Sequence, residues 1–347
     1  MPSTGAYLHG GFKVVYEYAN RLVNDGISVN IIYPLAVTWQ QYSLLYKIKR
    51  VIHYFRALLK SSYKPSWFNI DSRINQIWVP FLSGYFMPHS DCIFATGWET
   101  AVFLNGYHIE PSKKYYLIQS FEDWCGPKER VAETWKYSMK KIVISQGLKN
   151  IADSFGQEVT LIENGFDSKE FPLINPIESR DKFSVIMLYH EWELKGSKIG
   201  LQALKIVKSK YSQLKVSFFG TPEKPKDLPE WVTYYQLPKE LFNLYNEASI
   251  YLGTSFHEGF GLTVGEAMQC GCAVVCTENY GYKVMAQHNV TALLSPIGDA
   301  DGLAENIIKL IEDIDLRIKI ARNGHQYIQK FTWERAYGKL KALIEIS

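Results

Sequence analysis

Two carboxylates flank a glycine-rich turn in the second half of the chain. Glu258 and Glu266 lie in the stretch HEGFGLTVGEAMQCGCAVVC, which runs from His257 to Cys276 and ends in an apolar run. Carboxylates accept hydrogen bonds, so the pair suits a ligand rich in hydroxyl groups. Main-chain amides of a glycine turn at a helix start suit phosphate oxygens. A ligand that carries both sugars and a diphosphate satisfies both requirements.

Each carboxylate also has a purely structural explanation. Thr263 and Glu266 have the spacing of a capping box, in which the glutamate would only return a hydrogen bond to the helix start. Glu258 could be an exposed acid in a loop. The sequence alone leaves these alternatives open.

The elements that must position these residues follow from periodicity. Short apolar runs bounded by turn residues alternate with helical patterns, which favours α/β layers around parallel sheets. Strands are expected at residues 29–33, 77–80, 91–96, 115–119, 142–145, 159–162, 184–188, 214–219, 232–235, 250–252 and 273–276. Helices are expected at residues 12–23, 199–208, 241–247, 263–269, 303–311, 316–327 and 333–344. Prolines and charged residues at 171–182 predict an interdomain linker.

A glycine pair, Gly10 and Gly11, precedes the first predicted helix. Such a pair allows backbone amides to approach an anion or a sugar closely. A doubly wound domain normally opens with a strand that leads into its first glycine loop. Only nine residues precede the pair here. We therefore expect the first strand to be either very short, at Ala6–Leu8, or missing.

The composition is that of a globular protein of two domains. The chain has 347 residues, of which 47% are hydrophobic and 21% charged, and this length exceeds one ordinary domain. No apolar run is long enough for a transmembrane helix and no signal peptide is visible. Five cysteines, an odd number, fit a reducing cytoplasmic setting better than a disulfide framework. The net charge of +3 is too small to indicate nucleic acid as a partner.

Basic residues gather between residues 39 and 64, a segment without Asp or Glu. Its cations interleave with apolar side chains, as in helices that lie on a membrane surface. The six cations are Lys47, Lys49, Arg50, Arg56, Lys60 and Lys64. Peripheral membrane contact through this segment is one hypothesis. The alternative is a helix that packs on the first domain with its charged face in water.

The block E-G-F-G-L-x-x-x-E-A-M-x-x-G that starts at Glu258 resembles the signature of retaining, nucleotide-sugar-dependent glycosyltransferases, family 4 (glycosyl transferases group 1). The resemblance covers essentially all of the second half and is weaker in the first. It implies an α/β fold of the GT-B type, with two Rossmann-like, doubly wound parallel-sheet domains that face a cleft. The expected boundaries are 1–172 for the acceptor-binding domain, 173–330 for the nucleotide-sugar-binding domain, and 331–347 for a helix that returns to the first domain.

The resemblance also implies roles for individual residues. Glu258 would accept hydrogen bonds from the donor sugar, Glu266 would hold the ribose, and Lys195 would lie against the diphosphate. Backbone amides would contact the sugar and diphosphate at Gly259, Phe260, Gly261 and Leu262, and Gly11 would contribute from the first domain. The donor would be a UDP-, GDP- or dTDP-linked sugar, with no cofactor and no metal.

The sequence departs from the family at two places. Many relatives have an arginine five residues before the lysine, where this chain has His190. The imidazole could be protonated by the phosphate, another cation could serve, or the histidine could simply end a strand. Many relatives also have a histidine after the strand at 115–119. Here Gln119 and Glu122 follow instead, which resembles bacterial polysaccharide and rhamnose transferases and places them at the acceptor or donor sugar.

The resemblance therefore predicts transfer of a sugar to a saccharide or lipid-linked acceptor with retention, in surface polysaccharide or glycoconjugate synthesis. The enzyme would be cytoplasmic, at the inner face of the membrane if it binds lipid. A sugar-nucleotide epimerase and a non-catalytic saccharide-binding relative remain alternatives. An NAD-dependent oxidoreductase is disfavoured because no G-x-G-x-x-G follows a strand. The D-x-D strings at Asp299 and Asp313 lie far along the chain from the glycine turn, and we expect them at the surface.

Overall fold

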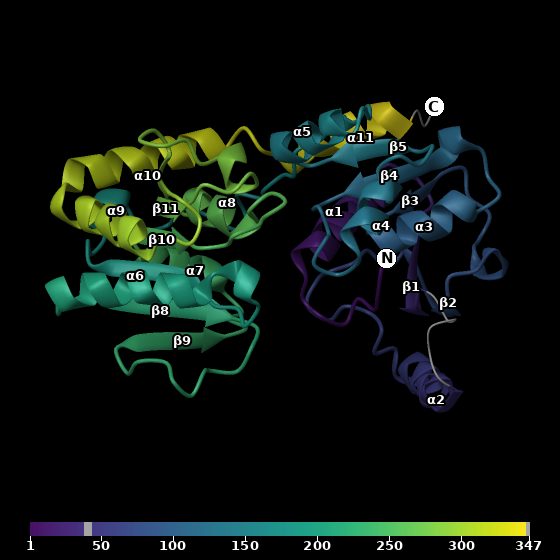
Figure 1. Ribbon diagram of the computed structural model, residues 1–347, viewed down its shortest axis with the longest axis horizontal. Coiled ribbons are helices and arrows are strands. Elements are labelled where there is room, and N and C mark those ends of the chain that lie inside the picture. The colour runs from purple at the N-terminus through teal and green to yellow at the C-terminus, as the bar shows by residue number, and fades with distance from the viewer. Residues whose placement is uncertain (38–43, 345–347) are drawn as a thin grey trace. The chain divides into compact units, whose positions relative to one another are not determined.

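The computed structural model describes residues 1–37 and 44–344, and the chain forms two compact units (Figure 1). The first unit comprises residues 1–163 and 337–347, and the second comprises residues 164–336. The expected boundaries were at 172 and 330. The predicted linker at residues 171–182 therefore lies inside the second unit rather than between the units.

The first unit has two parallel sheets and five helices before its C-terminal segment in the described residues. Its helices are α1 (Gly10–Asn24), α2 (Leu44–Lys60), α3 (Trp98–Gly106), α4 (Lys128–Thr134) and α5 (Gln146–Ser154). Its strands are β1 (Asn30–Ala36), β2 (Asn75–Phe81), β3 (Ile93–Ala95), β4 (Lys114–Ile118), β5 (Lys140–Val143) and β6 (Thr160–Leu161). Strands β1 and β2 pair with each other, and β3 to β6 form a four-stranded sheet in sequence order. All six strands that the sequence predicts in this half are present.

No strand precedes α1 among residues 1–9, so the short strand considered at Ala6–Leu8 does not form. Helix α1 begins at Gly10, and the glycine pair is its first turn rather than a loop before it. The segment that precedes the helix lies beside β1 and the loop at Tyr63. The amide of Gly5 donates to the Tyr63 carbonyl, and the Met1 amino group donates to the Ile32 carbonyl.

The second unit is one six-stranded parallel sheet with helices on both faces (Figure 1). Its strands are β7 (Ser184–Leu188), β8 (Lys215–Gly220), β9 (Val232–Gln236), β10 (Ile250–Gly253), β11 (Ala273–Thr277) and β12 (Ala292–Ser295). Its helices are α6 (Ser197–Lys210), α7 (Leu241–Glu247), α8 (Leu262–Gln269), α9 (Ala300–Glu312) and α10 (Ile314–Ile328). Strand β12 was not predicted; the other strands and these helices were.

The strand order β12-β11-β10-β7-β8-β9 is the doubly wound Rossmann order. Every residue of β10 and β11 is buried, as expected for central strands covered on both faces. The order reverses between β7 and β10, which pair directly with each other. Ligands bind in such sheets outside the carboxyl ends of the strands at this switch point.

Helix α11 (Trp333–Ile344) starts in the second unit and ends in the first. Tyr337 donates to the Asp25 carboxylate over 2.9 Å, and Lys341 pairs with the same carboxylate. Lys339 reaches Glu163 over 3.3 Å. The predicted return of the C-terminal helix to the first domain is thus confirmed by contacts that residues 337–344 make there.

Candidate functional site

The site in the second unit lies at the carboxyl ends of β7 and β10. Lys195 and His190 follow β7, and Glu258 follows β10. The two strands are hydrogen-bonded neighbours, so the loops that leave them meet at one edge of the sheet. The amide of Phe256 donates to the Leu194 carbonyl over 2.7 Å, which joins the two loops directly.

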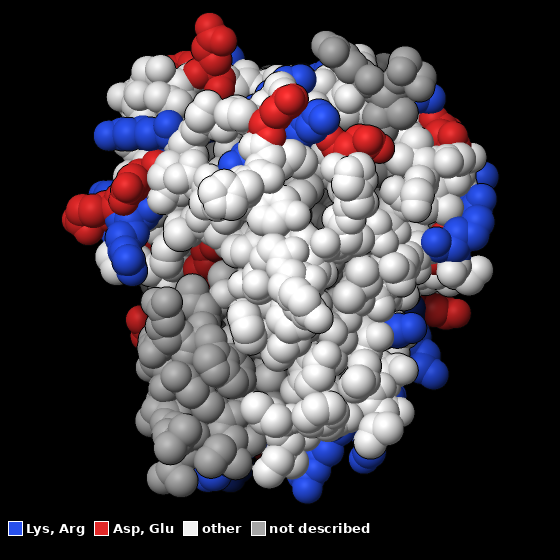
Figure 2. Space-filling model, turned by 90° about the vertical axis from the view of Figure 1, so that its right-hand side faces the viewer, with Lys and Arg blue, Asp and Glu red and all other residues white. Residues whose placement is uncertain are grey.

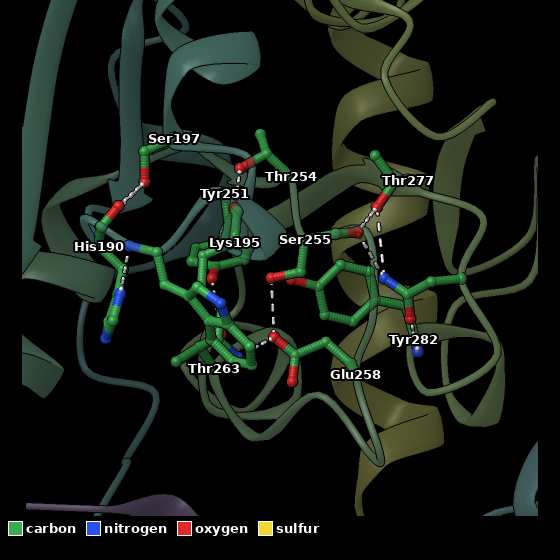
Figure 3. A network of polar contacts seen from close by, with 12 residues as sticks. His190, Lys195, Ser197, Tyr251, Thr254, Ser255, Glu258, Thr263, Thr277 and Tyr282 are labelled. Carbon is green, nitrogen blue, oxygen red and sulfur yellow. Dashed lines mark hydrogen bonds and ion pairs between the residues drawn. The ribbon is translucent and has the colours of Figure 1, made fainter. Parts of the chain in front are cut away.

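Glu258 is held by two donors on one of its oxygens. Lys195 Nζ and Ser255 Oγ both lie 2.7 Å from Glu258 Oε1 (Figure 3). The exposed fractions of the lysine and glutamate side chains are 22% and 15%, so neither is free in solvent. Neither bond involves the second carboxylate oxygen, Oε2, and the two bonds to Oε1 fix its orientation. The simple explanation of Glu258 as an exposed loop acid is therefore wrong.

Hydroxyl residues that precede Glu258 support this pair. Thr254 Oγ1 donates to the Lys195 carbonyl over 2.9 Å and fixes the backbone that carries the lysine. Sequence reasoning missed both Thr254 and Ser255. The sequence feature that could have identified them is the short run of hydroxyl side chains between a buried strand and a candidate site carboxylate.

The glycine turn leads into α8 through a backbone that only glycine adopts easily. Gly261 has φ +90° and is the N-cap of the helix, and no described side chain caps it. A Cβ at this position would lie 2.5 Å from the Tyr282 ring. Phe260 is 3% exposed and stacks on Phe166, so only its backbone is available to a ligand. The turn therefore presents main-chain groups and the positive end of α8, and ligand binding by the amides of Gly259 to Leu262 stays a prediction.

Glu266 lies within α8 and is 8% exposed. The capping-box explanation is wrong because Gly261, not Thr263, is the N-cap. Thr263 is the second residue of the helix, and its hydroxyl accepts a hydrogen bond from Tyr251 over 2.7 Å. The Tyr245 hydroxyl approaches Glu266 Oε2 at 3.4 Å. Glu266 is thus a nearly buried carboxylate that a capping role does not explain.

His190 is fixed through both its backbone and its ring. Its amide donates to Ser197 Oγ, and that hydroxyl donates back to the His190 carbonyl, each over 2.9 Å (Figure 3). The Trp192 amide donates to His190 Nδ1 over 2.9 Å. Burial, and then the charge of Lys195, lower the pKa of the imidazole.

The first unit brings Gln119 and Gly11 together. Gln119 follows β4, and its Nε2 donates to the Gly11 carbonyl over 3.1 Å. The Gly11 amide, which we expected to face a ligand, donates instead to His9 Nδ1 over 3.2 Å. His9 is the N-cap of α1. Sequence reasoning missed this cap because histidine is an uncommon residue at that position.

Glu122 lies at the start of α3. The Trp98 amide, the first of that helix, donates to Glu122 Oε2 over 2.7 Å. Burial, with a smaller contribution from the neighbouring Glu99 carboxylate, nevertheless raises the pKa of Glu122 to about 7 against the opposing hydrogen bond. Gln119 and Glu122 thus follow one strand, but the structure gives them different partners.

The acidic strings that resemble metal motifs act as helix caps. Asp299 accepts from the Gly302 amide at the start of α9, and Asp313 accepts from the Leu316 amide at the start of α10. Across the described residues no group of three His, Cys, Asp or Glu side chains could hold a metal ion. All five cysteines are free.

Known proteins share the second unit most clearly. Residues 170–327, most of that unit, match the family model described as glycosyl transferases group 1. This segment belongs to the glycosyl transferases group 1 family. The group 1 segment contains His190, Lys195 and both site carboxylates. The family that the sequence pattern indicated is therefore confirmed.

Curated relatives match this chain over short stretches. D-inositol 3-phosphate glycosyltransferase of Corynebacterium jeikeium is 33% identical over 108 residues, 31% of this chain and 26% of that protein. O-antigen chain mannosyltransferase B of Escherichia coli is 32% identical over 115 residues, 30% of this chain and 27% of that protein. The matched part therefore spans about a quarter of these relatives.

A solved structure covers nearly the whole chain. HepE of Anabaena in complex with UDP-glucose aligns with a TM-score of 0.72 and 17% identity, over 98% of this chain and 96% of its own. At this identity the likeness concerns the fold alone. Together with the two parallel-sheet units, it confirms the predicted GT-B fold.

Proposed function

We propose that this chain transfers a sugar from a nucleoside diphosphate sugar to a saccharide or lipid-linked acceptor, with retention of anomeric configuration. Surface polysaccharide or glycoconjugate synthesis is the process it would serve. The observation that carries the proposal is the Lys195–Glu258 pair at the switch point of a Rossmann-order sheet, beside the uncapped start of α8. Membership of the group 1 segment in its family supports it.

In this proposal, the sugar, the diphosphate and the ribose of the donor bind different groups of the second unit. The free edge of the Glu258 carboxylate receives sugar hydroxyls, and the amides at the start of α8 receive the diphosphate. Lys195 turns from Glu258 toward the phosphates as they arrive, because the diphosphate carries more charge than one carboxylate. Glu266 accepts from the ribose hydroxyls.

Catalysis in this proposal rests on stabilising the leaving group. The bond from the anomeric carbon to the phosphate oxygen breaks, so positive charge develops on the sugar and negative charge on the diphosphate. Lys195 and the helix start stabilise that negative charge, and one such contact contributes roughly 10²–10³ in rate. The acceptor attacks from the face that the phosphate leaves, and a phosphate oxygen takes its proton. Gln119 and Glu122 orient the acceptor or the donor sugar from the first unit.

The experiment is a panel of UDP-, GDP- and dTDP-sugars with release of nucleoside diphosphate as readout. At least one donor should yield product, and Glu258→Ala should abolish release. Glu193→Ala is the matched control, because that carboxylate lies near Lys195 in sequence but is 85% exposed. Release that persists in Glu258→Ala would refute the site assignment.

The same panel separates the alternatives. Binding without release from any donor would indicate a non-catalytic relative, and conversion of the donor sugar without nucleotide release would indicate an epimerase. Stereochemistry follows from the anomeric proton coupling of the product, where inversion would contradict the retaining proposal. We further propose that no metal takes part, so excess EDTA should leave the rate unchanged.

The second proposal concerns α2 and an anionic membrane. The helix packs on β2 through Tyr54, which stacks on Trp78, and through the buried Ala57. Its next face around the helix exposes apolar side chains by 41–86%: Val51, Ile52, Phe55, Leu58 and Leu59. With about 100° per residue, the face after that carries the exposed cations Lys49, Arg56 and Lys60.

An apolar face beside a basic face is the arrangement of a helix that lies on anionic lipid. It does not fit the alternative of a helix with only its charged face in water. Figure 2, which looks at the side of the first unit, shows a broad centre without charged side chains and Lys and Arg side chains along the lower edge. No helix in the described ranges, 1–37 and 44–344, is long and apolar enough to cross a membrane. We propose a cytoplasmic location at the inner face of the membrane.

Vesicle sedimentation tests this contact. The protein should bind vesicles of phosphatidylglycerol and phosphatidylcholine, and Phe55→Ser with Leu59→Ser should weaken binding strongly. Lys49→Gln, Arg56→Gln and Lys60→Gln together should remove the dependence on the anionic lipid. Lys198→Gln, which changes an exposed cation of the second unit, is the control. Equal sedimentation of all variants would refute the proposal.

A further inference from the structure

The loop after β7 fixes which nitrogen of His190 can carry a proton. The Trp192 amide donates to Nδ1 over 2.9 Å, and an amide N–H is a donor only. Nδ1 must therefore present a lone pair. In a neutral imidazole the proton then resides on Nε2, at the opposite edge of the ring. The reciprocal bonds between the His190 backbone and Ser197 keep the ring in this position.

Protonation of this ring would cost a hydrogen bond. A second proton on Nδ1 would oppose the Trp192 amide and leave both groups without their partner. Three charged groups act on the ring: Lys195 opposes its protonation, whereas Glu191 and Glu258 favour it. Burial of the ring is the main cause that lowers its pKa below the ordinary value, and the charge of Lys195 adds to it. The hydrogen bond from Trp192 and the burial of the ring thus both favour the neutral imidazole.

We propose that His190 binds the donor as a neutral imidazole whose Nε2–H donates a hydrogen bond to a diphosphate oxygen. This inference rests on the proposed function. It replaces two of the three ideas that the sequence left open, a phosphate-protonated cation and a residue without a role at a strand end. The group that stands where many relatives have a cation contributes one directional hydrogen bond and no charge.

A consequence is that Lys195 supplies the side-chain cation in this loop for the leaving group. Glu191 and Glu193 lie beside it in the sequence, and both are exposed. Donor binding should therefore depend strongly on Lys195 and the α8 amides. It should not gain as pH falls through the range where an ordinary histidine becomes charged.

Long-range ¹H–¹⁵N spectra of histidine-labelled protein test the tautomer directly. His190→Gln identifies the signal. At pH 7.5 the free protein should show Nε2 protonated and Nδ1 bare, and saturation with whichever of UDP, GDP or dTDP binds should leave that pattern unchanged. An imidazolium signal at this pH, in the free or the nucleotide-bound protein, would overturn the inference. If none of the three nucleotides binds, the proposed function fails instead, so the two failures are distinguishable.

Two substitutions give a functional readout. His190→Gln places a side-chain N–H near the position of Nε2. His190→Asn places its side-chain amide near the position of Nδ1, where the side-chain oxygen can still accept from the Trp192 backbone amide. We expect kcat/KM for the donor to fall less than about 10-fold in His190→Gln and about 10²-fold in His190→Asn. Equal losses in both, with recovery only in His190→Arg, would show that charge rather than the Nε2 proton matters.

Discussion

Glu122 is a carboxyl group whose ionisation state the fold changes. Burial raises its pKa to about 7, although the Trp98 amide donates to it. The folded state therefore holds the proton more tightly than the unfolded chain. The resulting stability is fully present below the unfolded pKa of about 4.5 and is lost as pH rises toward 7.

Glu122→Gln tests this effect at the residue where it arises. The amide oxygen still accepts from Trp98, but the side chain no longer ionises. As the pH rises from 5 to 8, the free energy of unfolding of the variant should increase by roughly 2 kcal/mol relative to that of the unchanged protein. Urea unfolding at several pH values measures this. A difference that does not vary with pH would contradict the raised pKa.

For individual residues, some contacts could be predicted from the sequence and others could not. The resemblance to a known family placed Lys195 and Glu258 in one site, and the structure joins them. The capture of the Gly11 amide by His9 was not predictable, because it depends on the side-chain rotamer of a neighbour. Ser255 was missed because a serine near a loop has many uses.

Among the elements, the turn into α8 depends on glycine at one position. Gly261→Ala forces an alanine to φ +90° and its Cβ toward the Tyr282 ring. We expect a loss of about 2–4 kcal/mol in free energy of unfolding and loss of nucleotide binding. Gly338→Ala is the matched control, because nothing lies within 4 Å of a Cβ there, in the interior of α11.

The control should stabilise the protein by about 0.5–1 kcal/mol, since alanine favours a helix over glycine. Denaturant unfolding of both variants, followed by tryptophan fluorescence, gives the comparison. Equal stability of Gly261→Ala and the unchanged protein would mean that this turn does not require glycine.

The segment 171–182 packs as part of the second unit because of a buried arginine. Arg180 donates to the carbonyls of Tyr245, Ala248 and Cys270. Arg180→Met would leave these acceptors unsatisfied and should lower the free energy of unfolding by roughly 3 kcal/mol or more. Arg322→Met, which removes only an exposed pair with Glu178, should change stability little. Similar effects of the two substitutions would contradict the anchoring role.

Residues 171–182 were wrongly predicted to be a linker because the contacts that anchor them are distant in the sequence. Prolines and charges are typical of linkers, and the carbonyls of Tyr245, Ala248 and Cys270 that Arg180 binds are 65 to 90 positions away. The capping-box error has a related origin, since the pattern at Thr263 does not reveal that the chain turns at Gly261. Most strands were predictable because their periodicity is local, whereas β12 and the helices α3, α4 and α5 were not predicted.

On the scale of the whole molecule, the two parallel-sheet units followed from the alternation of strand and helix patterns. Strand order did not, because pairing between distant strands leaves no periodic trace in the sequence. The order matters for function: it places the loops after β7 and β10 side by side at the switch point. The site carboxylate and its lysine meet for that reason.

The central claim is that a nucleoside diphosphate binds at this sheet edge with its ribose on Glu266. Calorimetric titration of UDP, GDP and dTDP into the unchanged protein and into Glu266→Gln tests it most directly. At least one nucleotide should bind the unchanged protein, and the substitution should weaken that binding about 10-fold or more. Absence of binding for all three, or equal affinity in the variant, would contradict the account.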